Sequence, residues 1–145
     1  MASRRKGRIL AFQTLYAWDI SGRLPAGRIP DYRITADIIE PDTDEPLPDF
    51  SRLLVSGTIE NITAIDEMIR QHLENWDFSR LNKVDLAILR ISVYALMYQT
   101  ETAPSIIINE AVGISKEFGT DDSYRFINGV LDGIRKTLAK NDQSP

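Results

Sequence analysis

The sequence contains no cysteine and only one histidine, His72. Without cysteine there are no disulfide scaffolds, zinc–thiolate sites, iron–sulfur clusters or cysteine nucleophiles, and one histidine excludes histidine-rich metal sites. No apolar run reaches the length of a membrane span. The basic segment 4–6 also lacks the apolar stretch of a secretory signal. We therefore expect a cytoplasmic protein without a metal ion.

Sequence signals of catalysis are missing as well. The chain has no glycine-rich phosphate loop. A Ser–His–Asp arrangement would have to use His72, which lies inside a predicted helix without a nucleophile elbow. Neighbouring carboxylates occur at 42–45, 66–67 and 121–122, where a loop, an exposed helix face and a helix start explain them structurally. We predict that the protein is not an enzyme and binds no cofactor.

The net charge of −4 conceals an asymmetry along the 145 residues. Residues 1–28 carry six basic side chains and one acidic side chain, for a net charge of +5. The remaining residues carry 11 basic and 20 acidic side chains, for a net charge of −9. This distribution indicates a basic arm on an acidic body.

Hydrophobic periodicity predicts an all-α protein. Apolar residues recur with the helical period in five segments, at residues 4–21, 50–76, 80–99, 104–118 and 121–138. The third of these is apolar on almost every side, which is typical of a central, buried helix. The run Ile106–Ile108 has the composition of a strand, but its continuation favours a helix.

The segments between the helices are polar. Residues 22–49 hold five of the seven prolines and predict a long acidic loop, with at most one short helix near Tyr32–Ile39. Asp49 or Ser51 is expected to cap the second helix, and Thr120 or Asp121 the last one. We expect the polar tail 139–145 to fray.

The basic head, which we define as Arg4, Arg5, Lys6 and Arg8, is the first candidate site. Cations bind phosphates, an aromatic ring stacks on bases, and an amide reads a base edge. Gln13 and Tyr16 lie on the same predicted helix and share a face with Arg5. The alternative is a solubilising terminus, with Tyr16 part of the core.

The second candidate is the corner between the last two helices. Phe118 lies near a helix end, and Asp122 and Phe126 lie one turn apart at the start of the next helix. Such a corner presents an aromatic ring beside backbone N–H donors. The alternative is that both phenylalanines fill the interior of a helical bundle.

Three blocks of residues occur in an order and spacing typical of one family. They are Arg4–Arg8 with Gln13-Thr14-Leu15-Tyr16, the segment Leu81–Tyr94, and the run Ile108-Asn109-Glu110-Ala111, Lys116-Glu117-Phe118-Gly119 and Phe126–Asp132. With these blocks the chain resembles the NusB family of bacterial transcription antitermination factors, and the resemblance covers residues 4–138.

The resemblance implies one RNA-binding domain over residues 1–145, made of two small helical bundles packed together. The N-terminal half is expected at about 3–78 and the C-terminal half at about 79–140. The resemblance also implies binding to the single-stranded boxA element of ribosomal RNA leader transcripts, jointly with NusE, a small-subunit ribosomal protein. The complex is expected to join elongating RNA polymerase with other Nus factors and to suppress premature termination.

By position, the resemblance also assigns roles to individual residues. The RNA contacts it implies are Arg4, Arg5, Lys6, Arg8, Gln13, Tyr16, Phe118, Asp122 and Phe126, with Arg90 as a weaker candidate. It implies that Tyr16 and Asp85 face NusE.

Several positions depart from the family pattern. Gly7, Gly113 and Gly133 replace better helix formers, and Ile9 replaces a usual glutamate. Because a glycine inside a helix costs up to about 1 kcal/mol, we expect the first turn to be disordered until RNA or a partner binds.

Two other functions fit the same sequence. One is a stand-alone relative of the RNA-binding domain of ribosomal RNA cytosine methyltransferases, although 145 residues leave no room for a catalytic sheet. The other is a helical adaptor that binds only proteins. Salt dependence separates RNA binding from the adaptor, since four phosphate contacts predict a slope of about −2.8 for log affinity against log salt.

Overall fold

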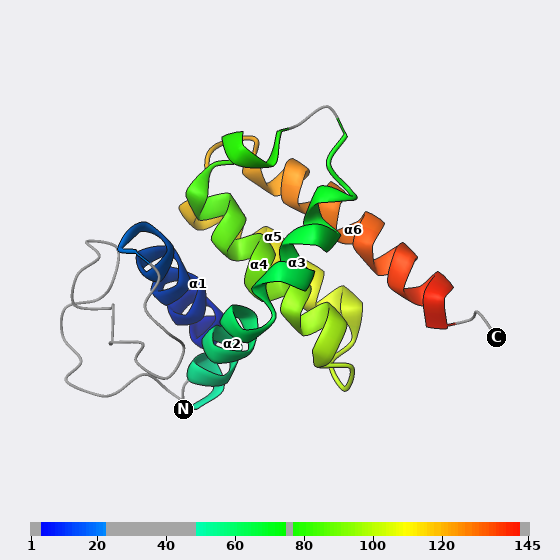
Figure 1. The fold of residues 1–145 in the computed structure, drawn as a ribbon, viewed down its shortest axis with the longest axis horizontal. Coiled ribbons are helices and arrows are strands. Elements are labelled where there is room, and N and C mark those ends of the chain that lie inside the picture. Colours follow the sequence, from blue (N-terminus) through cyan, green and yellow to red (C-terminus); the bar gives the residue numbers. More distant parts are fainter. Residues whose placement is uncertain (1–3, 23–48, 75–76, 143–145) are drawn as a thin grey trace.

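A computed structural model describes residues 4–22, 49–74 and 77–142 of the chain. These residues form helices and no strand, so the all-α prediction is confirmed (Figure 1). The elements in chain order are α1 (Arg4–Ile20), α2 (Asp49–Glu60), α3 (Ile62–Arg70), the 3-10 helix η3 (Phe78–Arg80), α4 (Lys83–Tyr98), α5 (Pro104–Phe118) and α6 (Ser123–Asp142). The run Ile106–Ile108 belongs to α5, as its continuation predicted.

Helix α4 lies at the centre of the fold. Every residue from Asp85 to Leu96 is buried, and α4 packs against each of the other five α-helices of the described chain. Its start is defined by Asn82, whose side chain accepts hydrogen bonds from the backbone N–H groups of Val84 and Asp85 at 2.8 and 3.3 Å. The prediction of a buried central helix is therefore confirmed, with the helix beginning at Lys83.

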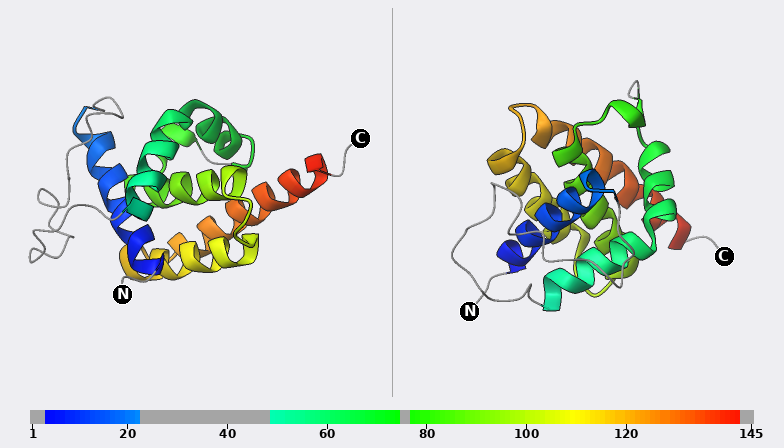
Figure 2. Two further views of the ribbon diagram at one scale, coloured as in Figure 1. Left: turned by 90° about the horizontal axis from the view of Figure 1, so that it is seen from below. Right: turned by 60° about the vertical axis from the view of Figure 1, so that its left-hand side comes forward.

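Two groups of helices lie on either side of α4. Figure 2 shows α2 and α3 along one side and the α5–α6 pair along the other, with α1 across one end. Buried side chains of both groups form one hydrophobic cluster, which includes Phe12, Leu54, Ile88 and Ile127. The expected two bundles thus share α4 and a common interior.

The predicted continuous helix over 50–76 is wrong, because the chain breaks at Asn61. Its side-chain amide donates to the carbonyl of Gly57 at 2.8 Å, and its backbone has φ −114° and ψ 20°. Asparagine side chains commonly compete for main-chain hydrogen bonds in this way. Periodicity misses the break because the apolar positions continue with nearly the same phase in α3, which ends at Arg70.

Several helix ends also differ from expectation. Ser51 is not a cap: its hydroxyl donates to the carbonyl of Gly7 in α1 at 2.7 Å. Helix α6 begins at Ser123, two residues later than predicted, and continues through 139–142, where fraying was expected. Helix α1 ends as predicted, with Gly22 in the left-handed region at φ 102°.

The predicted loop interior (23–48), the short helix at Tyr32–Ile39 and Trp76 lie outside the described residues. None of the helices in the described ranges has the length and apolar character needed to cross a lipid bilayer.

Candidate nucleic-acid interface

The basic head forms the first turns of α1. Arg4 and Lys6 are exposed and Arg5 is half-buried, so three of its four cations reach solvent. The turn is helical in the free chain, which differs from the expected disorder. The hydrogen bond from Ser51 to Gly7 ties this turn to α2 and supplies part of the physical reason.

Phe50 of α2 lies under the basic head and supplies another contact. The guanidinium of Arg4 lies 4.3 Å from the centre of the Phe50 ring, and that of Arg8 lies 5.4 Å from it. A Cβ atom added at Gly7 would lie 2.7 Å from a carbon of the same ring. The glycine at position 7, where the family has a better helix former, therefore allows α1 and α2 to approach closely enough for cation–π contacts.

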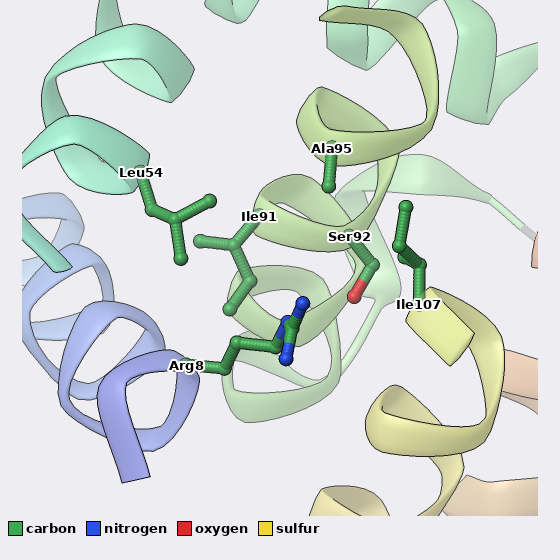
Figure 3. Close-up of a pocket in the computed structure, with 6 residues that line it drawn as sticks. All are labelled: Arg8, Leu54, Ile91, Ser92, Ala95 and Ile107. Carbon is green, nitrogen blue, oxygen red and sulfur yellow. The ribbon is translucent and has the colours of Figure 1, made fainter. Parts of the chain in front are cut away.

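Arg8 differs from the other head cations because only 8% of it is exposed. Figure 3 shows its side chain extending from α1 toward Ile91 and Ser92 of α4, into a small and mostly apolar pocket. Its Nη1 lies 3.9 Å from the Glu110 carboxylate of α5. Burial lowers the pKa of Arg8, an effect that Glu110 opposes and Arg4 adds to. Arg8 thus packs between the exposed part of the head and the interior, where it contacts α4 and α5.

Arg5 links the head to α5. Its Nη2 lies 2.8 Å from Oε2 of Glu117, in the last turn of α5. Gly113 lies one turn earlier on α5, and a Cβ atom there would be 2.7 Å from Nη1 of Arg5. The glycine at position 113, another position where this chain lacks the usual better helix former, therefore makes room for the Arg5 guanidinium to lie against α5.

The same end of α5 carries the second candidate site. Phe118 is half-buried and meets Phe12 of α1 edge to face, with ring centres 5.3 Å apart. Asp122 is exposed and Phe126 is half-buried. Both phenylalanines pack partly against the core, so they are neither wholly interior nor wholly displayed. Together with the Arg5–Glu117 pair, these contacts join the head and the corner into one surface.

The structure adds three residues to this surface that the sequence reasoning did not single out. Lys116 lies 5.0 Å from the ring centre of Tyr124, and the Nε of Arg125 donates to the Tyr124 hydroxyl at 2.9 Å. The hydrogen bond to Tyr124 is the main reason that the pKa of Arg125 is raised. Tyr124 and Arg125 lie within the second candidate segment and Lys116 lies two residues before it, so an aromatic residue with cations near it in the sequence was a usable signal. We define the head–corner surface as Arg4, Arg5, Lys6, Lys116, Phe118, Asp122, Tyr124, Arg125 and Phe126.

Two further predicted RNA contacts are buried, as Arg8 is. Gln13 is 2% exposed, so the face shared with Arg5 and Tyr16 is not continuously open to solvent. Arg90 is 2% exposed and donates to both carboxylate oxygens of Asp66, at 2.8 and 2.9 Å. Its place in the centre of α4 explains why it does not join the head–corner surface.

The predicted partner residues lie at a different place, where the end of α1 meets the start of α4. Tyr16 is half-buried one turn before Asp19, whose carboxylate lies 4.0 Å from the ammonium of Lys83. Asp85, two residues further along α4, is 8% exposed. Among buried side-chain polar atoms in the described residues, its Oδ1 is without a hydrogen-bond partner. Burial raises the pKa of Asp85, and a hydrogen bond with Ser123 partly offsets the effect.

His72 has a structural role. Its Nδ1 donates to the carbonyl of Met68 at 2.8 Å, and its Nε2 lies 2.7 Å from the Thr137 hydroxyl of α6. Gly133 lies beside its ring, where a Cβ atom would be 3.2 Å from Cδ2. Within the described ranges, no group of three or more His, Asp or Glu side chains is placed to hold a metal ion.

Comparison with known proteins identifies one family. The NusB family model matches residues 5–136. Transcription antitermination protein NusB of Treponema denticola is 52% identical over 91% of this chain and 95% of its own. The proteins of the same name from Bacillus cereus and Nitratiruptor are 43% and 41% identical, over 93% and 99% of this chain and 98% and 99% of their own.

Solved structures with the same fold come from this family. NusB of T. maritima superposes with a TM-score of 0.75 at 30% identity, covering 93% of this chain and 92% of that one. A crystal structure of the antitermination factors NusB and NusE in complex with double-stranded RNA gives a TM-score of 0.75 at 28% identity, with 92% and 96% covered.

Proposed function

Because this chain belongs to the NusB family, we propose that it is a transcription antitermination factor that binds boxA RNA together with NusE. It acts by binding rather than by catalysis, in the cytoplasm. Its complex joins elongating RNA polymerase with other Nus factors and keeps the polymerase from terminating early. A NusB relative of the same fold has been crystallised with NusE and double-stranded RNA, which supports both partners.

The observation that carries the proposal is the head–corner surface. It combines exposed cations for phosphates with aromatic rings on which bases stack, at the junction of α1, α5 and α6. We assign phosphate contacts to Arg4, Arg5 and Lys6. We assign base contacts to Phe118, Phe126 and Asp122, whose carboxylate accepts from exocyclic amines.

Four buried or half-buried residues have other roles in this proposal. Arg8 and Gln13 hold the head from beneath, since both are buried. Tyr16 and Asp85 mark the surface for NusE at the α1–α4 junction. The orphan Oδ1 of Asp85 is suited to a donor from a basic ribosomal protein, because a buried acceptor without a partner is costly.

RNA binding is tested by the salt dependence of affinity. We expect the wild-type chain to bind a fluorescent single-stranded boxA RNA, with log affinity falling against log salt at a slope of about −2.1, or roughly −0.7 for each of three exposed cations. The variant R4Q/R5Q/K6Q should lose this slope and most of its affinity. A boxA duplex measured in parallel decides which form of RNA is preferred.

The matched control is R135Q/K136Q/K140Q, which removes three positive charges from α6. These residues lie near the C-terminal end of α6, away from α1 (Figure 1). If the control lowers RNA affinity as much as the head variant does, the assignment to the head is overturned. NusE binding by a chain that does not bind RNA in either form would favour the protein adaptor.

NusE binding is tested separately by titrating the purified partner. The substitutions Y16A and D85A should each weaken NusE binding while leaving the RNA affinity of the free chain within about twofold. Equal NusE affinity for both variants and the wild type would contradict the assigned surface.

A further inference from the structure

Helix α5 presents two carboxylates to the arginines of the basic head. Glu110 lies 3.9 Å from Arg8, and Glu117 lies 2.8 Å from Arg5. The two glutamates are seven residues apart, which places them on one face of α5, two turns from each other. The free chain therefore neutralises part of its head with its own acids.

The two pairs differ in their access to solvent. The Arg8 and Glu110 side chains are 9% and 25% exposed, whereas those of Arg5 and Glu117 are 41% and 52% exposed. An exposed ion pair contributes little to stability because water and salt compete with it. The Arg5–Glu117 pair is therefore the exchangeable one.

We propose that Glu117 is an internal competitor for the phosphate that binds Arg5, and that this competition sets RNA affinity. The inference rests on the proposed RNA-binding function. Carboxylate and phosphate both accept hydrogen bonds from the guanidinium fork. The same N–H groups of Arg5 therefore bind either the carboxylate or the phosphate, but not both. RNA must displace Glu117 before Arg5 contacts its backbone.

Gly113 determines where this exchange takes place. Because the residue has no side chain, the guanidinium lies against α5 within reach of Glu117. Phe118 follows Glu117 directly in the sequence. A phosphate that replaces the carboxylate at Arg5 is therefore held at the end of α5 that carries the aromatic residues of the corner. An anion that carries no nucleobase cannot also contact these aromatic residues, so it gains less binding free energy when it displaces Glu117.

The test is a double-mutant cycle on RNA affinity. Glu117→Gln keeps the shape of the side chain and removes its charge. We expect it to bind single-stranded boxA RNA about two- to fivefold more tightly than the wild type, the range expected for loss of an exposed ion pair. In the R5Q background the same substitution should change affinity by less than about 1.5-fold, since no guanidinium remains to be released.

The matched control is D121N, which removes the same charge from an exposed residue of the same corner. Equal tightening by E117Q and D121N would mean that only net charge matters and would overturn the inference. So would an undiminished effect of E117Q in the R5Q background. Absence of RNA binding by the wild type is a different result, because it removes the proposed function itself.

Discussion

Two arginine–carboxylate pairs in this molecule have the same separation but differ in their exposure to solvent. Arg5 and Glu117 are 2.8 Å apart, as are Arg90 and Asp66, yet the side chains of the first pair are 41% and 52% exposed and those of the second 2% and 11%. Arg90 also reaches Asp19 at 3.2 Å. The distance between two charges therefore does not tell whether the pair can exchange its partner or is a fixed part of the fold. Its exposure to solvent does.

The physical reason is the cost of an unpaired charge. An exposed arginine that loses its carboxylate is solvated by water, so its pair exchanges readily with another anion. A buried arginine has no such alternative, and its carboxylates are fixed parts of the fold. In the proposed function RNA binds at one end of α1, at Arg5, whereas the structural contact between Asp19 and Arg90 lies at the other end.

Removing Arg90 gives the largest expected effect. The substitution R90M removes the guanidinium that both Asp66 and Asp19 contact and leaves the buried Asp66 carboxylate without it, so the free energy of unfolding should fall by about 3–5 kcal/mol. Urea unfolding measures the change. The matched variant R5M should lower stability by less than about 1 kcal/mol, and equal losses for the two variants would erase the contrast between the pairs.

Arg8 is intermediate, and its substitution sharpens the comparison. Its guanidinium is buried but lies 3.9 Å from Glu110, and burial lowers its pKa. Because R8M removes a poorly solvated charge and keeps the aliphatic volume, we expect its stability to stay within about 1 kcal/mol of the wild type. Its salt slope for RNA should be unchanged, whereas a slope reduced by about 0.7 would make Arg8 a phosphate contact.

The smallest expected effect is a pH dependence from Asp85. Burial raises its pKa in the folded chain, so the folded state binds more protons than the unfolded state just above the unfolded pKa of about 3.9. The contribution of Asp85 to stability should therefore fall as pH rises through the folded pKa. Unfolding of the wild type and D85N in urea, between about pH 4 and about pH 7, measures it. A difference that grows in favour of the wild type with rising pH would contradict this assignment.

Much of the secondary structure followed from local patterns. Pro104 and the apolar spacing after it defined α5, and the all-round apolar segment 80–99 identified α4 as the central helix. The break at Asn61 was not predictable from periodicity, because the apolar pattern continues across it. Its local mark is the side chain of Asn61, which donates to the carbonyl of Gly57.

The candidate site followed from the sequence only in part. The clustered cations of the head and the motif around Phe118 marked two regions far apart in the chain. That these regions form one surface depends on the Arg5–Glu117 and Phe12–Phe118 contacts, which no spacing rule connects. From the sequence, Gly7 and Gly113 were expected to weaken their helices, whereas both are positions where another element approaches closely.

The sequence alone thus determined the helical class, the family and the segments that carry charge and aromatic rings, because composition and periodicity are properties of the chain itself. The tertiary structure decided which arginines face water. Arg4 and Arg90 are chemically identical side chains, but one is exposed at a helix start and the other is enclosed at the centre of α4. Burial depends on every helix packed around a residue, and only the folded chain defines it.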